Sequence, residues 1–175
     1  MKTDAIQHFL KSTLLGFTVA TAFFSAAAGA ADTVPAVAQK TLTASNQTTG
    51  DTWKSVATQT IAAGDVTYAY REMGKKNGGT PVVFLVHLAA VLDNWDPRVM
   101  DGIAAKHHVI AFDNRGIGAS SGSPANSMEQ MADDAITFIK AMGLKQVDLL
   151  GFSMGGMIAQ EIVLKEPQLV RKMVI

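Results

Sequence analysis

Apolar positions along this chain follow two different periods. Six segments have the apolar runs or the alternation typical of β-strands: residues 58–62, 66–72, 81–86, 108–112, 146–150 and 169–175. Gly64 and Asp65 separate the first two segments and predict a hairpin turn. The third segment, PVVFLV, is continuously apolar, which is typical of a strand buried on both faces of a sheet.

Helical spacing occurs between the later apolar runs. Residues 127–142 predict an amphipathic helix, in which Ser127 and Gln130 are placed for a capping box and Gly143 ends the helix. Residues 154–165 predict a second helix. Because strands and helices alternate after the hairpin, we predict an α/β fold with a mostly parallel sheet and an antiparallel N-terminal hairpin.

Composition narrows the possible partners. The chain has 15 basic and 15 acidic residues and a formal net charge of zero, which argues against nucleic acid or a polybasic membrane surface. The absence of cysteine excludes disulfides, thiolate metal sites and a cysteine nucleophile. The four histidines lack metal-ligand spacing, and we interpret the adjacent His107 and His108 as the solvated start of a strand.

The N-terminus has the pattern of an export signal. Residues 1–30 combine a charged start, an apolar core and the small pair Ala28 and Ala30, which predicts cleavage and a periplasmic or secreted protein. Membrane contact is then expected only during export; the alternative is an N-terminal membrane anchor. Residues 31–55 are rich in small polar residues and predict a flexible leader before a globular domain at residues 56–175.

The pentapeptide from Gly151 to Gly155 joins a predicted strand to a predicted helix. The pattern G-x-S-x-G in this setting is the nucleophile elbow of serine hydrolases, and it places Ser153 beside the free N–H groups of a helix N-terminus. A β-carbon at either flanking glycine is expected to collide with the neighbouring strand or helix. Alternatively, Ser153 only caps the helix, although a cap requires neither glycine.

Three local patterns together resemble the α/β-hydrolase superfamily, in its esterase, lipase and haloperoxidase-like branch. They are the apolar strand ending at His87, the turn DNRGIGAS at residues 113–120, and the elbow at 151–156. The resemblance covers residues 56–175 and implies the α/β-hydrolase fold, a small-molecule ester or acyl substrate, and no metal or organic cofactor. A serine at position 153 differs from the aspartate nucleophile of the dehalogenase and epoxide-hydrolase branches.

The resemblance also implies roles for single residues. Ser153 is the expected nucleophile, and the backbone N–H of Met154 is one expected oxyanion donor. The second expected donor is Ala89, with Leu88 as the less favoured choice. Leu88 stands where the family usually has glycine, so we expect an altered local backbone, since leucine resists positive φ. The turn at residues 113–120 is expected to be structural.

Other residues near the expected site have two interpretations each. His87 is tempting as a base, but its counterpart in the family is a structural histidine at the end of the strand. Asn94 and Trp95 precede a short helix that Asp96 and Pro97 open. We therefore expect His87, Asn94 and Trp95 either to line a pocket or to serve only local structure.

In the family, the acid and the histidine that complete the catalytic triad follow later strands. The chain ends at Ile175 inside the sixth predicted strand, so we expect a domain truncated there and lacking both groups. We predict a serine hydrolase acting on carboxylic esters or related acyl compounds, and we expect the truncated chain alone to be inactive. The alternatives are a non-catalytic binding protein and an inactive fragment of the same fold.

Overall fold

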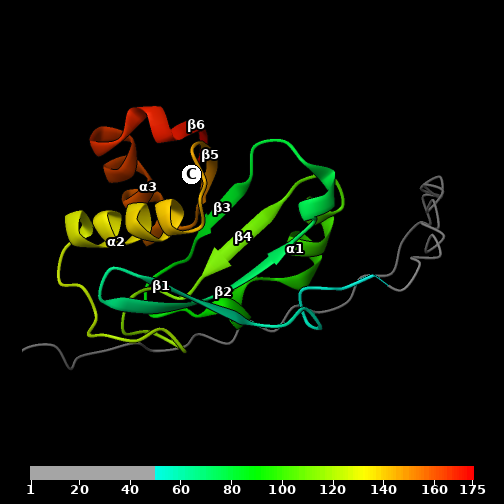
Figure 1. The fold of residues 1–175 in the computed structure, drawn as a ribbon, viewed down its shortest axis with the longest axis horizontal. Coiled ribbons are helices and arrows are strands. Elements are labelled where there is room, and N and C mark those ends of the chain that lie inside the picture. The colour runs from blue at the N-terminus through cyan, green and yellow to red at the C-terminus, as the bar shows by residue number, and fades with distance from the viewer. Residues whose placement is uncertain (1–49) are drawn as a thin grey trace, which may run out of the picture. The chain divides into compact units, whose positions relative to one another are not determined.

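The computed structural model describes residues 50–175, which form a six-stranded sheet and three α-helices (Figure 1). The strands are β1 (Gln59–Ala63), β2 (Val66–Met73), β3 (Val82–Leu85), β4 (Val109–Phe112), β5 (Val147–Gly151) and β6 (Val170–Val174). The helices are α1 (Pro97–Ala104), α2 (Met128–Ala141) and α3 (Met154–Lys165), with 3-10 turns at Lys75–Asn77, Leu92–Asn94 and Pro167–Leu169. The export signal expected at residues 1–30 lies outside the described residues. Between residues 50 and 175, no helix has the length and hydropathy needed to cross a membrane.

The sheet has the strand order β1-β2-β4-β3-β5-β6. β1 pairs with β2 antiparallel, and β2 pairs with β4 antiparallel. The pairs β3–β4, β3–β5 and β5–β6 are parallel. The predicted fold class, a mostly parallel sheet with an antiparallel N-terminal hairpin, is confirmed, and Gly64 turns the hairpin with a φ of 64°.

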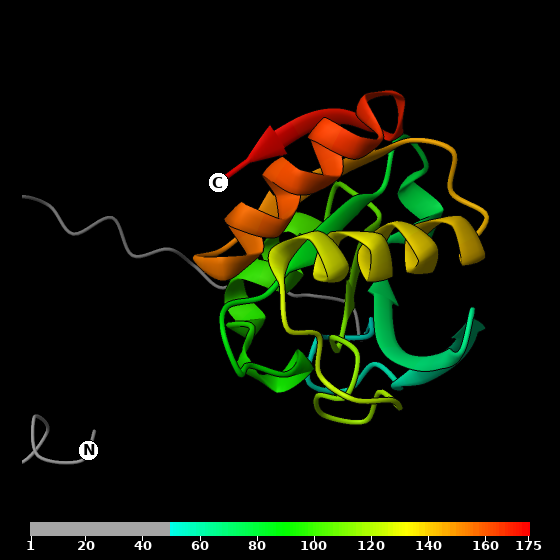
Figure 2. The ribbon, with the colours of Figure 1, turned by 90° about the vertical axis from the view of Figure 1, so that its left-hand side faces the viewer.

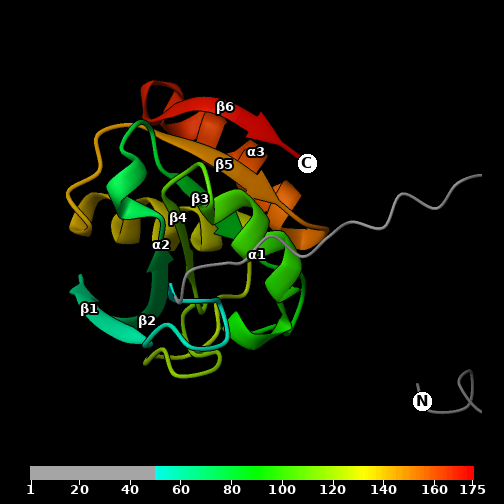
Figure 3. The same ribbon diagram turned by 90° about the vertical axis from the view of Figure 1, so that its right-hand side faces the viewer.

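Alternate residues of the central strands pack on opposite faces of the sheet. Val83 and Leu85 of β3 belong to the hydrophobic cluster that includes α2 and α3. Phe84 and Val86 belong to a second cluster, which includes Met100 of α1. Figure 2 shows α2 and α3 on one side of the sheet, and Figure 3 shows α1 on the other. The continuous apolar runs of the sequence are therefore explained by burial on both faces.

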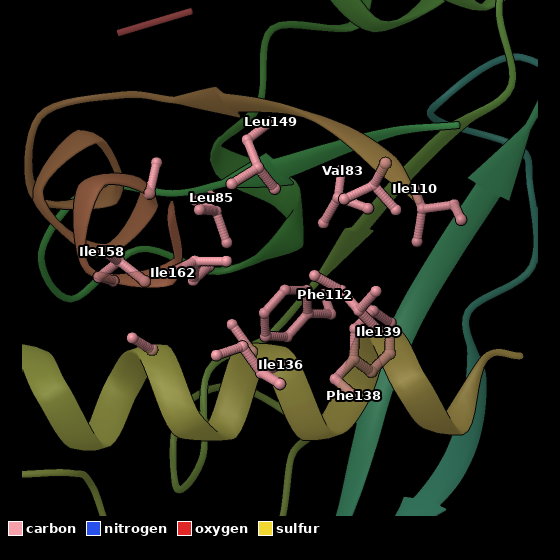
Figure 4. Close-up of a cluster of buried hydrophobic side chains, with 14 of the residues drawn as sticks. Val83, Leu85, Ile110, Phe112, Ile136, Phe138, Ile139, Leu149, Ile158 and Ile162 are labelled. Carbon is pink, nitrogen blue, oxygen red and sulfur yellow. The ribbon is translucent and has the colours of Figure 1, made fainter. Parts of the chain in front are cut away.

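Phe138 of α2 is a fully buried member of the larger cluster (Figure 4). Its ring stacks on Phe112 of β4 with centroids 4.3 Å apart. It also meets Tyr68 and Tyr70 of β2 edge-on, at 5.6 and 5.9 Å. These contacts join α2 to the antiparallel part of the sheet, and aromatic pairs of this geometry stabilise beyond the area that they bury.

The ends of α2 largely follow the sequence prediction. Ser127 Oγ accepts a hydrogen bond from the Gln130 N–H at 3.1 Å. The Gln130 side chain, however, accepts from the N–H of Asn126 at 3.3 Å, so the reciprocal half of the predicted capping box is displaced by one residue. Gly143 follows the helix with a φ of 73°, the left-handed conformation expected of a C-terminal glycine.

The burial of Trp53 shows that the packed domain begins earlier than we predicted. Its side chain is 1% exposed, although we placed it in the flexible leader at residues 31–55. Its backbone N–H donates to Asp101 Oδ1 at 2.7 Å, and its indole N–H donates to the Leu92 carbonyl at 3.1 Å. The guanidinium of Arg71 lies over the indole, 5.5 Å from its centroid. The packed domain therefore begins before residue 56.

The predicted solvated pair at His107 and His108 is also corrected. His107 is exposed, but His108 is buried, and its Nε2 lies 2.9 Å from Glu72 Oε2. Glu72 is on β2, the strand that pairs with β4. Because this partner is 36 residues away in the sequence, local composition gave no signal of it.

We predict that Phe138→Ala lowers the free energy of unfolding by about 3–5 kcal/mol, because it removes a fully buried ring and leaves a cavity. Urea unfolding of the full chain measures this change. Leu164→Ala is the control: Leu164 is 77% exposed, so a change within about 0.5 kcal/mol is expected. Equal losses in the two variants would contradict the packing described for Phe138.

Candidate active site

The turn between β5 and α3 holds Ser153 in an unusual conformation. Its φ of 55° and ψ of −118° lie outside the regions that residues with a β-carbon normally populate. The Phe152 N–H donates to the Leu85 carbonyl of β3 at 3.0 Å, and the Gly156 N–H donates to the Ser153 carbonyl at 2.9 Å. Ser153 is exposed and makes no side-chain capping bond. The strand, turn and helix expected around G-x-S-x-G are present, and capping does not account for the serine.

The glycines of the elbow stand where two backbones touch. A β-carbon on Gly151 would lie 2.5 Å from the Gly155 carbonyl oxygen and 2.6 Å from the Gly156 Cα. A β-carbon on Gly155 would overlap the carbonyl group of Leu85. The collision expected from the sequence is therefore found at both positions, and it fixes how closely α3 can approach β3.

The loop after β3 provides a second unusual residue. Ala89 has a φ of 57°, whereas Leu88, where we expected the altered backbone, is not among the residues with positive φ. The left-handed conformation thus falls one residue later than expected, at Ala89, and leucine is accommodated at position 88. Leu88 itself is 72% exposed. Within residues 50–175, the N–H groups of Ala89 and Met154 donate no intramolecular hydrogen bond.

Asp113 holds this loop against the turn after β4. Its side chain is buried, Oδ1 accepts from the Leu92 N–H at 2.8 Å, and Oδ2 accepts from the Ala119 N–H at 3.0 Å. The Ser120 hydroxyl donates to the Asp113 carbonyl at 2.7 Å. A β-carbon on Gly118 would collide with the Asp113 carboxylate. The structural role expected for the DNRGIGAS turn thus includes fixing the loop that carries Ala89.

A cavity of about 150 Å³ lies beside these loops. Leu88, Ala89 and Ala90 line it from the loop after β3, and Met154 lines it from the elbow. Met128 and Met131 of α2 are also on its wall. Ser153 itself is not on this wall. The two expected oxyanion residues, Ala89 and Met154, are on it.

A polar cluster that the sequence did not predict includes Arg115 and Asp134, which both line this cavity. Arg115 donates to both oxygens of Asp65, at 2.9 and 2.6 Å, and its Nε donates to Asp134 Oδ1 at 3.0 Å. The hydrogen bond with Arg115 lowers the pKa of the Asp65 carboxyl, and the two carboxylates raise the pKa of the Arg115 guanidinium. Burial raises the pKa of the Tyr68 hydroxyl, and the charge of Asp134 raises it further. At neutral pH the cluster therefore holds a charged arginine and a protonated tyrosine.

The remaining predicted pocket residues do not line this cavity. Trp95 is buried in the core, where its ring meets Phe84 edge-on at 5.1 Å. Asn94 is exposed, and its Oδ1 accepts from the Val91 N–H at 2.8 Å. His87 meets the ring of Phe152 edge-on at 5.5 Å, and its Nδ1 lies 3.1 Å from the Leu88 carbonyl oxygen. Asn94 and Trp95 thus make local contacts away from this cavity, and His87 lies beside the elbow.

No imidazole or carboxylate of residues 50–175 hydrogen-bonds to the Ser153 hydroxyl. In the same part of the chain, no group of three or more histidine and acidic side chains is placed to hold a metal ion.

The alpha/beta hydrolase fold family matches residues 80–175, more than half of the chain, and the chain belongs to this family. The human serine hydrolase BPHL is 32% identical over 127 residues, which cover 69% of this chain and 43% of BPHL. An alpha/beta hydrolase fold protein from Chitinophaga pinensis is 36% identical with a TM-score of 0.68, over 70% of this chain and 44% of that one. Est816, an N-acyl homoserine lactone degrading enzyme, is 28% identical with a TM-score of 0.55, over 66% of this chain and 43% of that one. The chain thus spans about two-fifths of the length of these relatives.

We predict that Gly155→Ala lowers the free energy of unfolding by about 3 kcal/mol or more, because the new methyl group forces α3 away from β3. Chemical denaturation of the full chain tests this. Gly102→Ala in α1 is the matched control: its β-carbon has no neighbour within 4 Å, and alanine favours the helix by up to about 1 kcal/mol. A Gly155→Ala chain as stable as the parent would show that the close contact at the elbow is not needed.

Proposed function

We propose that the protein is a serine hydrolase that acts on carboxylic esters or related acyl compounds, with Ser153 as the nucleophile. The observation that carries the proposal is the conformation of Ser153, which is backbone-strained, exposed and without a capping bond. Strain of this kind costs of order 1–3 kcal/mol and collects at functional sites. A strained residue whose side chain makes no capping bond in return is best explained by chemistry at its hydroxyl.

The free N–H groups near the serine support an oxyanion hole. Met154 is the first residue of α3, and its N–H has no acceptor in the preceding turn. We assign this N–H and that of Ala89 as the donors that hold the carbonyl oxygen as it becomes negative. Asp113 would then act as a positioning residue, because its carboxylate ties the Ala89 loop to the turn after β4.

The proposed reaction has two stages. Ser153 Oγ bonds to the acyl carbon while its proton passes to a general base, and the ester C–O bond breaks as the departing alcohol takes that proton. Water then attacks the acyl-enzyme, and the products are the carboxylic acid and the restored serine. Since no base in residues 50–175 bonds to Ser153, we expect the histidine and its acid outside this range, with His87 as the alternative base.

The relatives support this assignment. BPHL is named a serine hydrolase, and Est816 is an enzyme that degrades N-acyl homoserine lactones, which are acyl compounds. A non-catalytic binding protein is the second candidate, and the missing base in residues 50–175 is the observation that favours it. A covalent probe of serine reactivity separates the two functions.

We predict that, in a form of the protein that carries the expected histidine and acid, a fluorophosphonate probe labels Ser153, and that Ser153→Ala lowers ester hydrolysis by about 10⁴-fold or more with the fold intact. Intact mass and p-nitrophenyl ester hydrolysis report the two effects, and the exposed Ser123→Ala is the control. Labelling that persists in Ser153→Ala would remove Ser153 from the mechanism. Loss of labelling in His87→Ala, with unchanged circular dichroism, would identify His87 as the base.

We also propose that the protein is exported by the segment at residues 1–30. Cleavage after Ala30 is expected to give a mature protein that starts at Ala31, outside the cytoplasm. N-terminal sequencing of the protein recovered from a cell fraction outside the cytoplasm tests this. An intact Met1 in the membrane fraction would instead favour the N-terminal anchor.

A further inference from the structure

The cavity beside the elbow is the feature that the proposed reaction has not yet used. Its wall includes Ala89 and Met154, the two residues whose N–H groups we assign to the oxyanion hole. A group bonded to the acyl carbon at those donors is therefore next to the cavity. The wall is mostly apolar, so the cavity suits a hydrocarbon group and not a charged one.

One face of α2 forms a side of this cavity. Met128, Met131 and Asp134 line it at intervals of three residues along the helix, and the N-cap residue Ser127 lines it at the helix start. The wall therefore changes along the helix, from the thioethers of Met128 and Met131 to the carboxylate of Asp134. Met154 adds a third thioether from the elbow. Methionine side chains are flexible and polarizable, so this part of the wall can adapt to alkyl groups of different shape.

The volume of the cavity and the polar residues on its wall limit the length of the hydrocarbon chain that it can hold. A cavity of about 150 Å³ is large enough for benzene, a group of about six carbon atoms. A longer chain that continues along α2 meets the ion pair of Arg115 and Asp134. Asp134 Oδ2 has no hydrogen-bond partner within residues 50–175. This oxygen is already buried, so hydrocarbon placed against the ion pair covers the part of Arg115 and Asp134 that is still exposed without offering either group a hydrogen bond, which is unfavourable.

We propose that this cavity is the acyl-binding subsite of the hydrolase and that it selects short acyl groups of about four to six carbon atoms. The inference rests on the proposed function, since it takes the N–H groups of Ala89 and Met154 as the oxyanion donors. A carboxylate product places its oxygens at those donors and its alkyl tail in the cavity. Binding of linear carboxylates therefore tests the subsite without any need for turnover.

The experiment measures the Kd of acetate, butyrate, hexanoate, octanoate and decanoate for the full chain carrying Ser153→Ala, by NMR titration. Affinity is expected to rise about threefold to fourfold for each methylene buried, up to hexanoate, and then to fall. Met131→Trp fills the cavity and moves the optimum to acetate or butyrate, whereas Met131→Ala enlarges it and moves the optimum to octanoate. Met142→Ala is the matched control, because Met142 is a partly buried methionine at the end of α2 that does not line the cavity.

Opposite shifts in the two Met131 variants, with none in Met142→Ala, would establish the subsite. An affinity that rises steadily to decanoate would overturn it. So would an optimal carboxylate chain length that is the same in both Met131 variants as in the parent. The proposed reaction fails separately: short carboxylates that bind in the cavity, together with no fluorophosphonate labelling of Ser153, would leave a small-carboxylate binding site without hydrolase chemistry.

Discussion

The close approach of α3 to β3 is the constraint on which the rest of the site depends. At Gly155 the helix comes so near to the Leu85 carbonyl that no side chain fits between them. This contact, together with the bond from the Phe152 N–H to the same carbonyl, leaves only two residues for the turn from strand to helix. Ser153 is forced into its strained conformation as a result, and Met154 begins the helix with a free N–H beside the cavity.

The hydrophobic core supplies the rigidity that such a contact needs. Alternate residues of β3 and β4 pack on α2 and α3 on one face and on α1 and Trp53 on the other, so the strands cannot shift toward either side. Asp113 adds a polar tie between the loops that follow these two strands. The loop carrying Ala89 and the elbow carrying Ser153 are thereby held by neighbouring parallel strands, β3 and β5, in fixed register.

Most of the fold and the elbow could be predicted from the sequence, because both depend on local patterns. Apolar runs located the strands, and G-x-S-x-G located the turn, since backbone contact admits only glycine there. The features that were missed depend on partners far away in the chain. Trp53 is buried because Asp101 and Leu92 satisfy its N–H groups, and His108 is buried because Glu72 lies on the adjacent strand. Asp134 reaches the cavity only because α2 folds across the turn that carries Arg115.

The two non-glycine residues with positive φ in residues 50–175 are Ala89 and Ser153. Each such conformation is costly, and either could be avoided by a glycine or by a looser turn. Both residues lie on loops at the carboxyl ends of β3 and β5, where ligands bind in open α/β sheets. The strain is thus concentrated at the one edge where free N–H groups and an exposed hydroxyl converge. At Ser153 glycine would relieve the strain but would also remove the hydroxyl, so the proposed nucleophilic role of this side chain would account for the strain being kept.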